Sequence, residues 1–477
     1  MRSLVWFRGK DLRLSDHAPL RDAVAGGEAI PLFVLDPYFF DPSRAAELPH
    51  RMQFLLESLM SLEQNLIQRG SRLILAHGKS VDVVPRLAAA WKVDRVLAHR
   101  WVEPFARRRD QKVAERLRVP FKLYEGETLH PPGTLRTQNG TPYAVFSQFA
   151  RALRLTAQIE PPLSAPRSLP KVPELTSSSV AVPSCQELGI QPNSALLKGG
   201  ERAARLRLRQ FLSGAASNYA EQRDRMDLAG TSRLSADLKF GTLSVRSAWT
   251  AAQELSQSAP TSAGSFSNEL AWREFAYSTL WDRPELLEQP FRRDFAGFPW
   301  RTDPESFERW ATGTTGYPIV DAAARQLLGE GFVHNRARMV AASFLTKHLL
   351  IDYRQGEQHY LKYLTDGDWA SNNLGWQWSA GCGCDAQPYF RIFNPVTQGL
   401  RFDPEGNYVR RWVPELAALP ARYIHRPWEA PAAILTSANV ELGRSYPRPI
   451  IEHAHARERF LQVASRHLER ARARAAS

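Results

Sequence analysis

The sequence contains little cysteine, no zinc-type arrangement of cysteines and no long apolar run. Its three cysteines are Cys185, Cys382 and Cys384, too few for a disulfide framework and typical of a protein kept in a reducing compartment. Cys382 and Cys384 lack a second ligand pair at zinc-site spacing, so we expect no metal. No stretch of about 18 apolar residues occurs, which excludes a membrane-spanning helix, and no leader peptide opens the chain. We therefore expect a cytoplasmic protein.

The excess of basic residues indicates an anionic partner. There are 62 Lys and Arg residues against 49 Asp and Glu, a formal net charge of +13, and nucleic acid is the partner that this balance favours. Arginines near the C-terminus account for part of the charge. A chain of 477 residues is too long for one compact core, so we expect at least two domains.

Residues 1–130 alternate short apolar runs with helical patterns. The apolar runs are Ser3–Phe7, Ile30–Leu35, Arg72–Ala76, Arg95–Ala98 and Phe121–Tyr124, and the clearest helical patterns are Met52–Arg69 and Val81–Trp91. This alternation predicts an α/β, Rossmann-like domain with a parallel sheet and helices on both faces. No Gly-x-Gly-x-x-Gly follows the first run, so the phosphate loop of dinucleotide-binding domains is absent.

The rest of the chain divides into a linker and a helical part. We expect residues 131–200 to form an interdomain linker, because Pro161–Ser194 is rich in proline and serine. Residues 201–477 predict an all-α domain, with helical patterns at Glu201–Leu212, Asp321–Leu328 and Val333–Leu350.

Thirteen residues of the helical part combine indoles with carboxylates and amides. They include Asp366, Asp368, Trp369, Asn372, Asn373, Trp376 and Trp378. A solvated face does not gather three indoles, and an ordinary core does not accept two carboxylates. The stretch indicates a polar site with aromatic walls, and a partly buried loop with aromatic anchors is the alternative. Trp376 and Trp378 point about 200° apart on a helix, whereas on a strand they share a face.

Three further segments carry polar groups at helical spacing. The segment GTSRLS, residues 230–235, can cap a helix or bind phosphate at its N–H groups. Residues 268–275 place Glu269, Trp272 and Arg273 on one helical face, although a surface ion pair would account for the charged pair. Asn335 and Met339 lie one turn apart, beside His334, which we expect to be structural. Together these segments predict a cavity for a large, flat, partly polar ligand.

Over nearly its whole length the chain resembles the photolyase/cryptochrome family. The matching segments occur in this order: WFRGKDLRLSDH, GTSRLS, NELAWREF, TGYPIVDAA, HNRARM, DGDWASNN, WQW and AQPYFRIFNP. Within the family it resembles a class I cyclobutane pyrimidine dimer (CPD) DNA photolyase. The resemblance implies an α/β antenna domain, a helical FAD-binding catalytic domain, and repair of ultraviolet-damaged DNA by a monomer. In that reaction blue light excites reduced FAD, which passes an electron to the flipped-out dimer.

The resemblance also implies roles for individual residues. Those expected to hold FAD are Tyr219, Thr231, Ser232, Leu234, Ser235, Arg273, Arg338, Asp366, Asp368 and Asn372. Arg338 is the expected ion partner of Asp366. Asn372 is expected to face flavin N5, where an amide accepts a hydrogen bond without opposing an anionic ring.

On the DNA side, the residues expected to act on the lesion are Glu269, Asn335 and Met339, with Asn372 at the flavin. Trp272 and Trp378 are expected to wall the flipped-out dimer. Contacts to the DNA backbone are expected from Arg223, Arg336, Gln398 and Arg401.

The sequence departs from the family pattern in its electron relay and its antenna. Trp376 and Trp300 match the proximal and distal relay positions, but the middle position is Tyr353, whose oxidation requires loss of a proton. A detour through another aromatic side chain is the alternative. The folate-binding residues of one family branch are absent, so a second chromophore of unknown identity is left open. A cryptochrome photoreceptor and a (6–4) photolyase are the alternative functions, and Asn335, in place of a second histidine, disfavours the latter.

Overall fold

The computed structural model describes residues 1–174, 179–385 and 390–476. Residues 386–389 of the segment AQPYFRIFNP therefore lie outside the described residues. The chain forms two compact units, the first comprising Met1–Ala220, Thr231–Pro284 and Thr365–Ala370 and the second Glu221–Gly230, Glu285–Leu364 and Ser371–Ser477. No helix among the described residues is long and apolar enough to cross a membrane.

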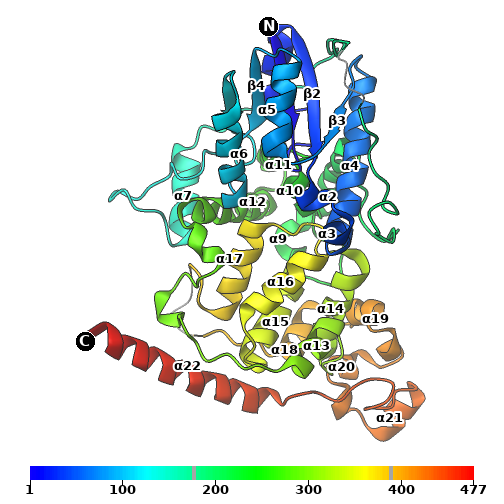
Figure 1. Cartoon of the computed structure of the whole chain (residues 1–477). Coiled ribbons are helices and arrows are strands. Elements are labelled where there is room, and N and C mark those ends of the chain that lie inside the picture. The colour runs from blue at the N-terminus through cyan, green and yellow to red at the C-terminus, as the bar shows by residue number, and fades with distance from the viewer. Residues whose placement is uncertain (175–178, 386–389, 477) are drawn as a thin grey trace. The chain divides into compact units, whose positions relative to one another are not determined.

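The first unit opens with a five-stranded parallel sheet in the order β3-β2-β1-β4-β5 (Figure 1). Its elements are β1 (Arg2–Phe7), α1 (Ala18–Gly26), β2 (Glu28–Leu35), α2 (Pro37–Phe40), α3 (Pro42–Ala46), α4 (Pro49–Ile67), β3 (Ile74–His77), α5 (Ser80–Ala90), β4 (Arg95–His99), α6 (Pro104–Arg116), β5 (Phe121–Tyr124) and α7 (Phe146–Thr156). All five predicted strands are present, and the predicted α/β fold class is confirmed.

Alternate side chains of the strands enter two different cores. Val5 and Phe7 pack with residues of α1 and α4 on one face, while Leu4 and Trp6 pack with residues of α5 and α6 on the other. A parallel sheet covered by helices on both faces requires strands that are apolar on both sides. This explains why its strands appear in the sequence as continuous apolar runs.

Helices complete the first unit. They are α8 (Glu201–Ser213), η1 (Ala215–Asn218), α9 (Tyr219–Gln222, which continues into the second unit), α10 (Ser235–Phe240), α11 (Val245–Leu255) and α12 (Pro260–Asp282). The predicted helix at Glu201–Leu212 is α8. The proline-rich linker packs along the α/β core: Leu169 N–H donates to the Arg69 carbonyl, and Val180 N–H donates to that of Leu75.

All the named elements among the described residues of the second unit are helices. Its elements are η2 (Pro284–Leu287), η3 (Arg293–Phe295), α13 (Pro304–Thr312), α14 (Pro318–Glu330), α15 (Asn335–Ser343), η4 (Phe344–His348), α16 (Tyr353–Tyr363), α17 (Trp369–Ala380, whose first residues belong to the first unit), α18 (Pro395–Phe402), α19 (Asn407–Trp412), η5 (Pro414–Leu416), α20 (Ala421–Ile424), η6 (Pro427–Glu429), α21 (Ala432–Ser437) and α22 (His453–Ala476).

One predicted helix is divided. The pattern of Val333–Leu350 is that of a single α-helix, but α15 ends at Ser343 and continues as the π-helix η4. Inside that turn the Thr346 hydroxyl donates to the Ala342 carbonyl at 2.7 Å, and such back-bonding by threonine favours distortion of a helix.

The end of α10 lies against the loop that follows β1. Leu12 N–H donates to the Phe240 carbonyl (3.3 Å), and Arg13 Nη1 donates to the Gly241 carbonyl (3.0 Å). Gly241 has a φ of +62°, and a Cβ built there would lie 1.9 Å from the Lys10 carbonyl oxygen. Only glycine permits both this backbone conformation and this close approach.

We predict that Gly241→Ala destabilises the protein by more than the roughly 1–2 kcal/mol that left-handed backbone alone costs a residue with a Cβ. The matched control is Gly189→Ala, where φ is +67° and no heavy atom lies within 4 Å of the added Cβ. Urea unfolding of both variants measures the difference. Equal losses of stability would show that the contact with Lys10 yields at little cost.

Candidate functional site

Both carboxylates of the DGD element, Asp366–Asp368, are buried in the first unit. Asp368 Oδ2 accepts a hydrogen bond from the Tyr277 hydroxyl at 2.7 Å and lies 3.3 Å from Lys10 Nζ. Two donors on one oxygen fix the rotation of this carboxylate. The Asp368 side chain is therefore held in one orientation, as preorganised binding of a ligand requires.

Arg273 projects from α12 into the same part of the first unit. Its Nη1 donates to the Glu127 carbonyl at 2.8 Å and contacts Glu274 Oε1 at 3.2 Å, and its guanidinium lies 4.1 Å from the ring centroid of Tyr277. Burial raises the pKa of Glu274 to about 7 despite the nearby charge of Arg273. Its neighbours thus hold the Arg273 side chain in one position.

The GTSRLS segment leads directly into α10. Arg233 has a positive φ of 51°, which turns the loop sharply before the helix. The N-cap residue of α10 is Leu234, and no side-chain hydrogen bond caps the helix. The capping expected from serine or threonine is therefore not observed, so no side-chain cap occupies the first N–H groups of α10. Backbone donors of this kind suit the phosphates of FAD.

Asn372 lies on α17 and is held by a residue that the sequence did not reveal. Its Nδ2 donates to the backbone carbonyl of Glu357 at 3.1 Å, which turns the amide oxygen away from that carbonyl. The Glu357 carboxyl is buried and accepts from Asn373 Nδ2 at 3.1 Å, and burial raises its pKa to about 7. Asn372 is thereby fixed as an acceptor, which suits the N5–H of a reduced flavin.

Glu269 and Trp272 lie on α12, and Trp272 has an aromatic partner that the sequence reasoning missed. The ring of Phe146 stacks on Trp272 with centroids 3.7 Å apart and an interplanar angle of 7°. Phe146 begins α7. One indole face is thus covered by Phe146, and the stack limits how the indole can turn.

The segment HNRARM opens α15. His334 caps the helix, because its Nδ1 accepts the Arg336 N–H at 3.2 Å, a contact that agrees with the expected structural role. Burial lowers the pKa of His334 to about 4, so it stays neutral. Asn335 is exposed and Met339 half-buried. Arg336, an expected phosphate ligand, pairs with Asp224 at 2.9 Å.

Trp376 is buried in the core of the second unit among aromatic rings. Its ring lies 5.1 Å from that of Tyr360 and 6.0 Å from that of Trp310. Tyr353 belongs to the same core, and Trp300 packs against Phe298 with centroids 4.3 Å apart. The detour that the sequence left open stays a prediction, and Trp310 and Tyr360 are aromatic neighbours of Trp376 available to it.

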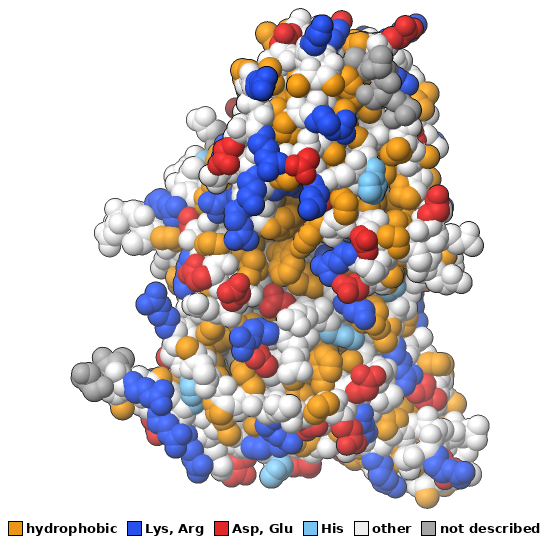
Figure 2. Space-filling model, in the orientation of Figure 1, with side chains coloured by type: hydrophobic (Ala, Val, Ile, Leu, Met, Phe, Trp, Pro, Cys, Tyr) orange, Lys and Arg blue, Asp and Glu red, His pale blue; other side chains and the backbone are white. Residues whose placement is uncertain are grey.

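Residues expected at the DNA backbone are accessible on the second unit. Arg401, at the end of α18, is exposed, while Gln398, Arg223 and Arg336 are half-buried. Trp378, which is expected at the lesion, is half-buried as well. Figure 2 shows that Lys and Arg side chains also gather along α22. The exposed arginines of that helix are Arg457, Arg466, Arg470, Arg472 and Arg474.

The expected flavin residues divide between the two units. The first contains Tyr219, Thr231, Ser232, Leu234, Ser235, Arg273, Asp366 and Asp368, and the second contains Arg338 and Asn372. Arg338 Nε donates to the Val333 carbonyl at 2.7 Å. The ion pair of Arg338 with Asp366 and the roles of these residues stay predictions.

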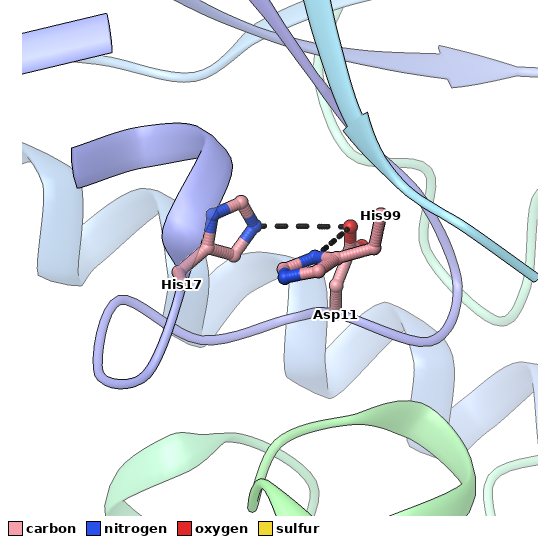
Figure 3. Close-up of side chains that lie close together, drawn as sticks. All are labelled: Asp11, His17 and His99. Carbon is pink, nitrogen blue, oxygen red and sulfur yellow. Dashed lines mark hydrogen bonds and ion pairs between the residues drawn. The ribbon is translucent and has the colours of Figure 1, made fainter. Parts of the chain in front are cut away.

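Three potential metal ligands, Asp11, His17 and His99, come together among the described residues, with ligand atoms within 4.8 Å of one another (Figure 3). His17 Nδ1 accepts the Leu20 N–H, so the neutral ring carries its proton on Nε2, facing Asp11. His99 Nδ1 lies 3.2 Å from Asp11 Oδ2, and burial lowers the pKa of His99 to about 3. These contacts join the three side chains in a buried hydrogen-bonded cluster, and the absence of a metal stays a prediction.

Two family models match the chain. The model described as DNA photolyase matches residues 3–170, and that described as the FAD binding domain of DNA photolyase matches residues 266–466. The deoxyribodipyrimidine photo-lyase of Agrobacterium fabrum is 42% identical over 96% of this chain and 96% of its own. That of Escherichia coli is 38% identical over 96% and 97%.

Solved structures that resemble this chain come from the same family as its sequence relatives. A bacterial class III photolyase from Agrobacterium tumefaciens has a TM-score of 0.92 at 40% identity, covering 98% of each chain. The class in its name differs from the class I that the motifs predicted. A cryptochrome of Synechocystis has a TM-score of 0.89 at 31% identity, covering 97% of this chain and 99% of its own. The chain belongs to the DNA photolyase family and carries its FAD-binding domain.

Proposed function

We propose that this protein repairs CPDs in DNA by light-driven electron transfer from reduced FAD. The observation that carries the proposal is the fixed amide of Asn372, whose nitrogen is held by the Glu357 carbonyl at 3.1 Å. Its oxygen is a neutral acceptor, which suits the N5–H of a reduced flavin and adds no charge against an anionic ring. The names of the curated relatives support the same reaction.

The chain's own residues bind and orient the reactants. FAD, when bound, supplies the excited electron donor. Asp366, Asp368, Arg273 and the N–H groups of the GTSRLS segment hold it, and Asn372 faces N5. Trp272 and Trp378 wall the flipped-out dimer, which unstacks at lower cost than an intact base pair, while Glu269 hydrogen-bonds the base edges. Arg223, Arg336, Gln398 and Arg401 bind the DNA backbone, so binding weakens with salt.

The remaining assignments belong to the same proposal. The protein acts as a class I enzyme and a monomer in the cytoplasm. Residues 1–130 form the antenna domain, 131–200 the linker and 201–477 the catalytic domain. A second chromophore is supported by an archaeal photolyase of Sulfolobus tokodaii described with two FAD molecules, which has a TM-score of 0.82 at 29% identity, covering 98% of this chain and 100% of its own. The cryptochrome likeness keeps light sensing as the second candidate.

We predict that the purified, reduced protein restores thymine absorbance in a CPD-containing oligonucleotide under blue light. Glu269→Ala should slow repair by about tenfold to a hundredfold, the worth of one hydrogen bond to a charged group, and still retain FAD. Asp366→Ala should lose FAD instead. Glu254→Ala, on the exposed end of α11, is the control and should repair normally. No repair by the wild-type protein would favour light sensing.

We predict that Tyr353→Trp photoreduces oxidised flavin several-fold faster than Tyr353→Phe, because an oxidised indole need not release its proton at once. Trp376→Phe should nearly abolish photoreduction. Transient absorption measures all three variants. Equal rates in the two Tyr353 variants would remove that residue from the relay, and Trp310→Phe would then be the slow variant. Repair from pre-reduced flavin should change little in any of them.

We predict that the Glu357 carboxyl makes stability fall as pH rises. Its folded-state pKa is raised, so between pH 4.5 and about 7 the folded protein holds a proton that the unfolded chain releases, worth up to roughly 3 kcal/mol. In urea unfolding, Glu357→Gln should remove this loss at pH 8, whereas Glu458→Gln on the exposed face of α22 should behave as wild type. If the free energy of unfolding of Glu357→Gln depends on pH as steeply as that of wild type, the Glu357 carboxyl is not the source of the pH dependence.

A further inference from the structure

A lysine lies buried among three carboxylates in the first unit. Lys10 Nζ is 2.9 Å from Glu103 Oε1, 2.5 Å from Glu127 Oε1 and 3.3 Å from Asp368 Oδ2. At most 5% of any of these four side chains is exposed. Water therefore contributes little to stabilising the charges, and each depends on the others.

Lys10 keeps its charge although it is buried. Burial alone lowers the pKa of Lys10, but the charges of Glu103, Glu127 and Asp368 outweigh burial and raise it well above its ordinary value. Glu127 is fixed by a further contact, because its Oε2 accepts the Val102 N–H at 2.7 Å. Lys10 is therefore a permanent cation held in one position.

Four stretches that are distant in sequence meet at this cluster. Lys10 lies in the loop after β1, Glu103 directly precedes α6, and Glu127 follows β5. Asp368 belongs to the DGD element, which forms part of the first unit. The α/β part of the chain thus supplies the cation that the DGD carboxylate faces.

A second cation of the α/β part contacts the same element. Arg51, on α4, donates from Nη1 to the Gly367 carbonyl at 3.4 Å. Lys10 thus acts on the Asp368 side chain, while Arg51 contacts the backbone one residue earlier. Tyr277 completes the set with its 2.7 Å hydrogen bond to Asp368 Oδ2.

We propose that Lys10 is a positioning residue for FAD binding: it fixes the Asp368 carboxylate, so the α/β part is needed to retain FAD and not only to capture light. This rests on the proposed function, in which Asp368 holds the flavin. Without the Lys10 cation, the buried carboxyl groups lose their counter-charge, and Asp368 loses one of the two groups that set its rotation.

The test compares Lys10→Met with Arg8→Met. Arg8 lies in the same loop and forms its own buried ion pair, with Nη1 2.7 Å from Asp110 Oδ2, and it has no contact with the DGD element among its described contacts. The rate at which the purified holoprotein releases FAD is followed by the recovery of flavin fluorescence, and melting temperatures of the FAD-free proteins measure stability. If Lys10→Met does not fold, Lys10→Gln takes its place.

Lys10→Met should release FAD about tenfold to a hundredfold faster than wild type, the range expected for losing a hydrogen bond between charged groups. Arg8→Met should release FAD at close to the wild-type rate, although its melting temperature should fall by about as much as that of Lys10→Met. Equal release from both variants would overturn the inference, since a general loss of stability would then explain it.

A double variant tests the route. If Lys10 acts through Asp368, Lys10→Met should add little to the FAD release of Asp368→Asn, whereas additive effects would overturn the inference. The proposed function fails separately: a wild-type protein that binds no FAD and repairs no CPD defeats it. If the wild-type protein binds FAD and repairs CPDs, but Lys10→Met retains FAD as well as Arg8→Met does, only the role of Lys10 is wrong.

Discussion

The burial of Lys10 among Glu103, Glu127 and Asp368 ties together four stretches of the first unit that are distant in sequence. A buried cation without anions, or buried carboxylates without a cation, would cost several kcal/mol. The folded state must therefore hold these side chains next to one another. Lys10 and Asp368 are 358 positions apart. The compact first unit includes the short DGD segment from late in the chain, and the Asp368 carboxylate of that segment is the third anion around Lys10.

The loop after β1 uses its other polar residues in the same way. Asp11 accepts from the Arg8 N–H at 2.6 Å and from His99 at 3.2 Å, and Arg13 donates to the carbonyls of Gly241 and Asp16. A segment that reads as WFRGKDLRLSDH is highly charged, yet almost all of it is buried. Its charged side chains form hydrogen bonds and ion pairs within the fold, which explains why so many polar residues occur in a buried segment.

The sequence predicted what is local and missed what depends on packing. The five strands follow from apolar runs of the right length, and α8 follows from helical spacing. Glu357 and Phe146 could not be found this way. The effect of Glu357 on Asn372 passes through its backbone carbonyl, which any residue has, and Phe146 meets Trp272 only after two distant helices pack. The capping of α10 by serine or threonine was expected and is not observed, because the helix begins one residue after Leu234.

The helix α17 explains how one short stretch can serve several purposes. Asn372 and Trp376 are four residues apart, so they lie on one side of the helix about one turn, roughly 5–6 Å, from each other. Asp368 precedes Asn372 by the same interval, directly before the helix begins. Trp378 is rotated about 200° from Trp376, which agrees with Trp376 being buried while Trp378 is only half-buried. A strand would have placed both indoles on one face and could not have separated the roles proposed for them, electron relay for Trp376 and lesion binding for Trp378.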